Sequence, residues 1–222
     1  MWLINSSIGR KLIMSISGTF LILFLLFHAT MNIVVLISPD AYNTICEFLG
    51  ANWYAIVGTL VLAGGFVIHI FYATFLTLLN LRARGKQRYA VVDSQKGVSW
   101  ASKNMFVLGL IICGFLALHI YQFWSKMQFV ELTGLGDHHL AADGAYWVNY
   151  WFSQPIFAAL YIVWLAALWF HLTHGVWSLM QSLGLNNKIW FPRLKVISNI
   201  VATIIVLMFM AVPIGFYIKS LV

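Results

Sequence analysis

Long hydrophobic stretches alternate with short hydrophilic segments along the whole chain. Five stretches exceed the roughly 20 residues that an α-helix needs to cross a bilayer. They cover residues 12–37, 53–80, 104–127, 150–183 and 196–219. We therefore predict an all-α integral membrane protein with five transmembrane helices, forming a single transmembrane domain over residues 1–222. The first stretch is much longer than a signal-peptide core of about 7–15 residues, so a cleaved signal peptide is not expected.

Composition leads to the same class and excludes several cofactors. Of the 222 residues, 62% are hydrophobic and only 9% are charged, whereas a soluble domain carries roughly 25% charged residues. Cys46 and Cys113 are the only cysteines, and an iron–sulfur cluster needs about four thiolates. The chain has no glycine-rich nucleotide-binding motif. We expect no iron–sulfur cluster and no FAD in this chain.

The charged residues indicate an orientation. The net charge of +7 would suit nucleic acid, but the placement of the charges favours a membrane topology instead. With five spans, the N-terminus and the segments 81–103 and 184–195 share one side, and they hold eleven of the thirteen Lys and Arg residues. Five of the six acidic residues lie on the other side. Because Lys and Arg concentrate in cytoplasmic loops, we predict a cytoplasmic N-terminus and an external C-terminus.

Five of the seven histidines lie within the hydrophobic stretches, where ionisable residues are costly and usually functional. A single one is explained by a hydrogen bond to a neighbouring helix, but four helices each carrying one is a poor match to chance. At about 1.5 Å per residue, His28 and His119 lie roughly 24 and 22 Å from the cytoplasmic ends of their spans. His69 and His171 lie roughly 16 and 18 Å deep, and His174 roughly 13 Å. The histidines thus occupy two levels.

Two histidines on different helices at one depth can ligate a haem iron from both faces. Neutral imidazole suits iron, and a helix bundle can house the macrocycle. Small residues one turn from the ligands would admit the flat ring: Gly65 and Ala73 flank His69, and Gly175 follows His171. Two haems at different depths would carry electrons across the bilayer, most naturally to a quinone. A soluble partner would dock on the basic cytoplasmic loops, and the propionates could pair with Arg10, Lys11, Arg82, Arg84, Ser102 and Lys103.

Other uses of the histidines stay open. Zinc or copper would need ligands converging on one point, although His171 and His174 share a helix face and could form a metal pair. A proton channel or proton-coupled carrier would be expected to carry carboxylates within its spans, and this chain has none there. A haem-free anchor or transporter leaves the paired depths unexplained.

Several short motifs occur in a specific order, about one for each predicted helix. They are Ser-Ser-Ile-Gly-Arg-Lys at 6–11 with Ser17-Gly18, His28 with Asn32, His69 with Asn-Leu-Arg-Ala-Arg at 80–84, Trp-Ala-Ser-Lys-Asn-Met at 100–105 before His119, and Phe-His-Leu-Thr-His-Gly-Val-Trp-Ser at 170–178 with Gln-Ser-Leu-Gly at 181–184. In these motifs the chain resembles, over nearly its whole length, the membrane cytochrome b subunit of succinate:quinone oxidoreductase and quinol:fumarate reductase. The resemblance is to the branch with one five-helix subunit and two haems b.

This resemblance implies that His28 and His119 ligate a distal haem b and that His69 and His171 ligate a proximal one. His174 would then lie near a propionate. It also implies a flavoprotein partner with FAD and the dicarboxylate site, an iron–sulfur partner docked on this chain, and menaquinone as the quinone. The expected location is a bacterial inner membrane, and the expected assembly is a dimer of heterotrimers without nucleic acid.

The chain departs from this family at one position. Some members carry a glutamate two residues before the last haem ligand, and this chain has Trp169 there. A quinone site needs a proton donor or acceptor, and Glu47, Asp137 and His138, together with Asp40, are candidates by side of the membrane alone. No catalytic residue is assigned. The alternative function is a cytochrome b subunit for another quinone-linked dehydrogenase, of the hydrogenase or formate dehydrogenase type.

Overall fold

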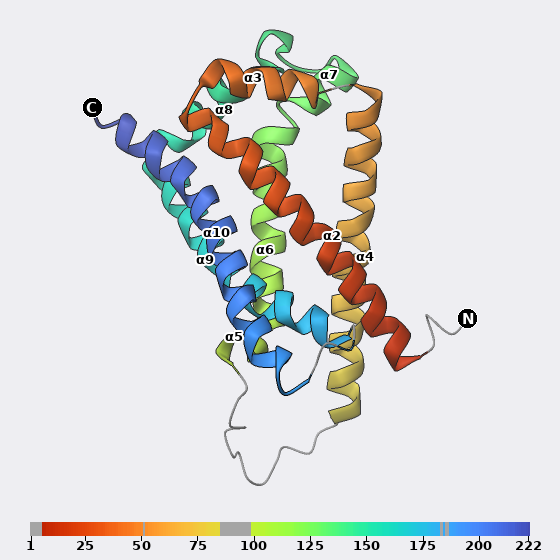
Figure 1. Cartoon of the computed structure of the whole chain (residues 1–222). Helices are drawn as coiled ribbons and strands as arrows, with labels where there is room; N and C mark the ends of the chain where they lie inside the picture. The colour runs from red at the N-terminus through yellow and green to blue at the C-terminus, as the bar shows by residue number, and fades with distance from the viewer. Residues whose placement is uncertain (1–5, 51, 85–98, 183, 185–186) are drawn as a thin grey trace.

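Five long helices form the body of the protein in the computed structural model, which describes residues 6–50, 52–84, 99–182, 184 and 187–222. They are α2 (Ser7–Ile33), α4 (Trp53–Arg84), α6 (Met105–His119), α9 (Pro155–Ser182) and α10 (Trp190–Lys219) (Figure 1). The described residues contain no β-strand. Each long helix, with its short extension where it has one, is long and apolar enough to cross a membrane. The predicted all-α, five-helix membrane protein is confirmed.

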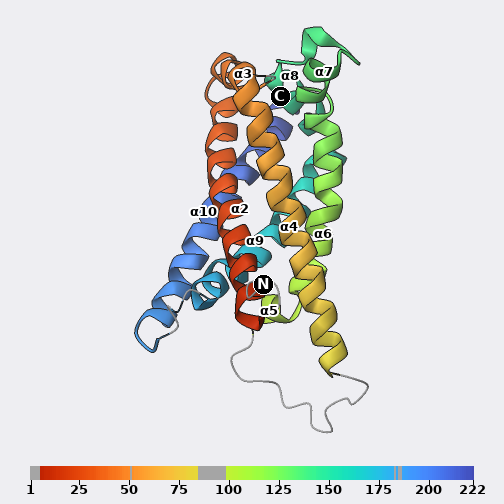
Figure 2. The same ribbon diagram turned by 90° about the vertical axis from the view of Figure 1, so that its right-hand side faces the viewer.

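Short helices cover one end of this bundle. They are α3 (Pro39–Phe48), α7 (Gln128–Thr133), η3 (His138–Leu140) and α8 (Gly144–Phe152), and they lie at the top of Figures 1 and 2. We call this the capped end. The opposite end, where α2 and α10 begin and where α5 (Trp100–Lys103) lies, is called the basic end. Lys126, Lys219 and all five acidic residues that the structure describes lie at the capped end, whereas the other described Lys and Arg residues lie at the basic end.

The predicted boundaries need one correction. The hydrophobic stretch 150–183 is not one helix. Its first residues belong to α8, and residues 153–154 form a turn before α9 begins at Pro155. Proline has no N–H and clashes with a preceding helical turn, so it is suited to the first turn of a helix and not to its middle. The stretch is continuously apolar because the last residues of α8, including Phe152, which is buried in the cap, directly precede the apolar helix α9.

The remaining spans lie close to their predicted positions. Helix α2 begins at Ser7, earlier than residue 12, because the hydroxyl of Ser6 accepts a hydrogen bond from the Gly9 N–H (2.9 Å) and caps the helix. Helix α10 likewise begins before residue 196, at Trp190. Helix α6 ends at His119 and continues as a π-helical turn, η2 (Ile120–Trp124).

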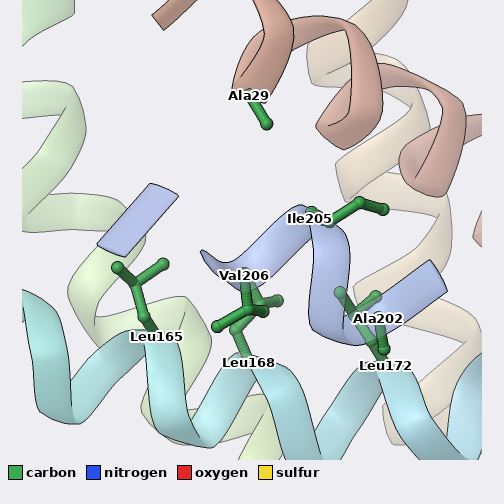
Figure 3. Close-up of a cluster of buried hydrophobic side chains, with 7 residues drawn as sticks. All are labelled: Ala29, Leu165, Leu168, Leu172, Ala202, Ile205 and Val206. Atoms are coloured by element: carbon green, nitrogen blue, oxygen red, sulfur yellow. The ribbon is translucent and has the colours of Figure 1, made fainter. Parts of the chain in front are cut away.

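A buried cluster joins α2, α9 and α10. Its buried side chains are Ala29, Leu165, Leu168, Leu172, Ala202, Ile205 and Val206 (Figure 3). Ala29 and Ala202 are 0% exposed, and small residues of this kind let transmembrane helices approach closely. A second cluster at the capped end includes Val35 (in η1, Val34–Leu36), Tyr42, Phe152 and Tyr161, and it ties the cap to the bundle.

Candidate functional site

Four intramembrane histidines meet in two pairs, with the same partners that their depths predict. The rings of His28 on α2 and His119 on α6 have centroids 5.9 Å apart and are nearly perpendicular, at 87°. The rings of His69 on α4 and His171 on α9 have centroids 6.4 Å apart, at 70°. We call His28–His119 the capped-end pair and His69–His171 the basic-end pair.

The two pairs lie at different depths in the bundle. Tyr161, the ring neighbour of His119, and His171 are both on α9 and ten residues apart, which is about 15 Å of helix. Ser17, the partner of His69, and His28 are both on α2 and eleven residues apart, which is about 16 Å. Two helices thus indicate the same separation of the levels.

The hydrogen bonds of the basic-end pair favour one tautomer of His69. The Ser17 hydroxyl lies 3.2 Å from Nδ1 of His69 and donates its own proton to the Met14 carbonyl (3.1 Å). A hydroxyl that gives its single proton to the Met14 carbonyl accepts from the His69 Nδ1–H, and Nε2 then keeps a free lone pair. Nδ1 of His171 is buried and has no hydrogen-bond partner among the described residues.

The capped-end pair has a longer polar connection. Nδ1 of His119 lies 3.3 Å from the hydroxyl oxygen of Tyr161, which donates to Oε1 of Gln122 (2.7 Å). On the other ring, the Asn32 amide nitrogen lies 3.3 Å from Nδ1 and 3.4 Å from Nε2 of His28. Aromatic rings surround both imidazoles: Phe24 and Phe209 beside His28, and Phe123 and Trp164 beside His119.

These donor atoms fit a haem better than a bare metal ion. Two imidazoles that share a metal, each about 2 Å from it, have ring centroids roughly 6 Å apart. Both observed separations agree with this spacing. A bare ion needs three or four protein ligands, and the described residues contain no group of three His, Cys, Asp or Glu side chains that could hold one. A haem would bring its other nitrogen ligands with it, so one pair of histidines would be enough to hold its iron.

Some of the glycines expected to flank the rings have other neighbours. A side chain at Gly65 would collide with the ring of Phe20, so this space is filled by an aromatic residue of α2. Gly18 instead faces His69, where an added Cβ would lie 3.6 Å from Cε1. Gly175 has open space around it.

A cavity of about 380 Å³ opens near the basic end between α5, α9 and α10. Its polar lining includes Ser102 and His174, two of the predicted propionate contacts. It also includes Lys195, whose ammonium group lies 5.1 Å from the centre of the Trp177 ring and 4.5 Å from that of Phe191. The ring of His174 packs edge-on against the ring of Trp177, with the ring centroids 4.8 Å apart, so its observed partner is an aromatic side chain. From the sequence, Lys195 was used only as one of the positive charges that indicate the membrane orientation.

None of the other predicted propionate contacts whose side chains the structure describes is among the residues that line this cavity. The guanidinium of Arg10 lies 5.8 Å from the centre of the Phe75 ring and donates to the Ser6 carbonyl (3.3 Å). Lys11, Arg82 and Lys103 are exposed, and the side chain of Arg84 lies outside the described residues.

The four predicted quinone residues lie on the surface of the cap. Asp40 and Glu47 are exposed on α3, and His138 is exposed beside Gly134. Asp137 is exposed and accepts a hydrogen bond from the His139 N–H (3.0 Å) at the start of η3. None of them is among the ring or hydrogen-bond neighbours that the structure describes for the capped-end pair.

A buried polar link reaches the cap from the capped-end pair instead. The Tyr42 hydroxyl on α3 donates to Oδ1 of Asn32 (3.1 Å), one turn beyond His28. Burial raises the pKa of Tyr42 above its usual value, and burial raises the pKa of the neighbouring Cys46 thiol to about 11. Sequence reasoning missed Tyr42 and Gln122. A glutamine three residues after His119 inside an apolar stretch is the signal that could have found the latter.

Comparison with known proteins does not assign the chain to a group. No protein-family model matches it, and neither a curated protein nor a solved structure shows significant similarity. The functional assignment therefore depends on the paired histidines and their surroundings.

Proposed function

We propose that this chain is the dihaem cytochrome b subunit of a succinate:quinone oxidoreductase or quinol:fumarate reductase. The observation that carries the proposal is the meeting of four histidines from four helices in two facing pairs, about 15 Å apart along the bundle. His28 and His119 would hold the distal haem b, and His69 and His171 the proximal one. When bound, each haem supplies one-electron redox chemistry, and the chain would act as membrane anchor and electron path.

The chain's own residues would orient and shield these groups. Ser17 and Tyr161 keep Nε2 of His69 and of His119 free to bind metal, since each occupies the Nδ1 position. The surrounding aromatic rings exclude water from the capped-end pair. Ser102, His174 and Lys195 would hold the anionic propionates of the proximal group at the basic-end cavity.

The distribution of charge supports the proposed partners and orientation. The basic end would face the cytoplasm of a bacterium, as the positive-inside rule requires, with the end of α10 on the external side of the inner membrane. Its cations would attract an iron–sulfur subunit, which in turn would carry the flavoprotein with FAD and the dicarboxylate site. Menaquinone would react at the capped end, and the complex would form a dimer of heterotrimers.

The test is a reduced-minus-oxidised visible spectrum of the purified membrane complex, with haem quantified per chain. We expect two low-spin haems b that titrate at two potentials. Copurification of a flavoprotein with succinate or fumarate activity would support the named complex, whereas hydrogenase or formate dehydrogenase activity would favour the other quinone-linked class. One haem per chain, or none, would contradict the proposal.

A further inference from the structure

Gln122 is a fully buried polar residue beside the capped-end pair. It is 0% exposed and lies in the π-helical turn η2, where the Ser125 N–H bonds to the Ile120 carbonyl (2.9 Å). Its backbone carbonyl accepts from the indole N–H of Trp151 (3.0 Å), and its Oε1 accepts from Tyr161. Its Nε2 has no partner among the described residues. A buried glutamine that leaves its amino group unpaired costs free energy, and π-turns often occur at functional sites.

The hydrogen bonds from His119 through Tyr161 to Gln122 can be formed with only one assignment of donors and acceptors. An amide oxygen can only accept, so the Tyr161 hydroxyl must give its single proton to Gln122. The Tyr161 oxygen is then available only as an acceptor, and it must receive the Nδ1–H of His119. The lone pair of His119 consequently resides on Nε2.

The basic-end pair uses the same device with different residues. There the chain of bonds runs from His69 through the Ser17 hydroxyl to the Met14 carbonyl, which also can only accept. One histidine in each pair is thus held in one tautomer by a hydroxyl whose proton is committed elsewhere. The acceptors differ, because one is a backbone carbonyl and the other is a side chain that can be replaced.

We propose that Gln122, acting through Tyr161, is the positioning residue that tunes the electron-donating strength of His119, and thereby the midpoint potential of the capped-end haem. This inference rests on the proposed function. An acceptor on the distal N–H of a ligating imidazole makes the ligand more basic. A more basic ligand stabilises ferric over ferrous iron and lowers the potential. Gln122 strengthens this effect because hydrogen bonds in a chain polarise one another.

The experiment is a spectroelectrochemical titration of the purified complex, combined with electron paramagnetic resonance of the ferric haems. Tyr161→Phe should raise the potential of one haem only and change its g-values. A tenfold loss of preference for the ferric state corresponds to 59 mV for one electron. Gln122→Leu should shift the same haem in the same direction by less, because Tyr161 still accepts from His119.

Matched variants at the other pair provide the control. Ser17→Ala should raise the potential of the other haem and leave the first unchanged, and Ser17→Thr should restore it, since threonine keeps the hydroxyl. If the wild-type complex holds two haems but Tyr161→Phe and Gln122→Leu leave both potentials unchanged, this inference is wrong while the proposed function stands. Equal shifts in the midpoint potentials of both haems in either variant would also overturn the inference, since such shifts would indicate a general disturbance of helix packing. A wild-type chain without haem would overturn the proposed function itself.

Discussion

Gln128 connects three parts of the capped end, and its removal is a direct test of how that end is held. Its Oε1 accepts from the Thr59 hydroxyl on α4 (2.8 Å) and from the Trp124 indole N–H (2.8 Å), while its Nε2 donates to the Gly50 carbonyl (2.9 Å). The side chain is only 8% exposed. Gln128→Ala leaves three polar groups without this partner, at about 1 kcal/mol for each lost bond, so we expect a loss of about 3 kcal/mol in the free energy of unfolding.

For a chain of this length, that loss corresponds to a fall of roughly 6–12 °C in melting temperature. The assay is thermal denaturation of the detergent-solubilised protein followed by size-exclusion chromatography. Gln154→Ala is the matched control, because its amide makes a single exposed bond to the Tyr150 carbonyl (2.9 Å). Thr59→Val removes one of the three bonds and should cost about one third as much. If Gln128→Ala melts at the same temperature as Gln154→Ala, the three bonds do not hold the capped end.

Three further results are expected. His28→Ala and His69→Ala should each lose one of the two haems in a pyridine haemochrome assay. His174→Ala should keep both, because His174 packs against the ring of Trp177 and lines the cavity. Lys195→Gln should lower the potential of the basic-end haem in a redox titration, because a cation beside the propionates disfavours the ferric state. With the other cysteine replaced by serine, Cys46 should react slowly with a membrane-impermeant maleimide at pH 7. Because only the thiolate reacts and burial raises its pKa to about 11, that rate should rise about tenfold per pH unit up to pH 10.

The spans could be predicted because hydropathy measures transfer into lipid and because helix length follows from bilayer thickness. The same measure failed at residues 150–183, where α8 is apolar for burial in the cap. Hydropathy cannot distinguish a side chain that faces lipid from one that faces a protein core. Pro155 was the available signal, since proline is favoured in the first turn of a helix and disrupts a helix interior.

The histidine pairing could also be predicted, because helical rise is constant and depth needs no knowledge of helix rotation. The supporting residues could not, since Ser17, Tyr161 and Lys195 reach their partners only through the rotation and crossing of the helices. Arg10 and Asp137 show that knowing on which side of the membrane a residue lies is not enough to place it at a site. Each lies at the expected end, yet the structure places neither beside the cavity or the ring pairs.

Helix α4 is the element on which the basic-end pair depends most. Of its described side chains only Ala55 is less than one tenth exposed, and its principal neighbour is α2. Its position relies on polar contacts: Thr59 with Gln128 at the capped end, and His69 with Ser17 at mid-depth. In lipid, apolar packing has no hydrophobic driving force, so such contacts carry more of the helix association. His171, by contrast, lies on α9 beside the tightly packed cluster. The basic-end pair therefore joins one rigidly held histidine to one held by a few specific bonds, and variants of those bonds should affect it before they affect the capped-end pair.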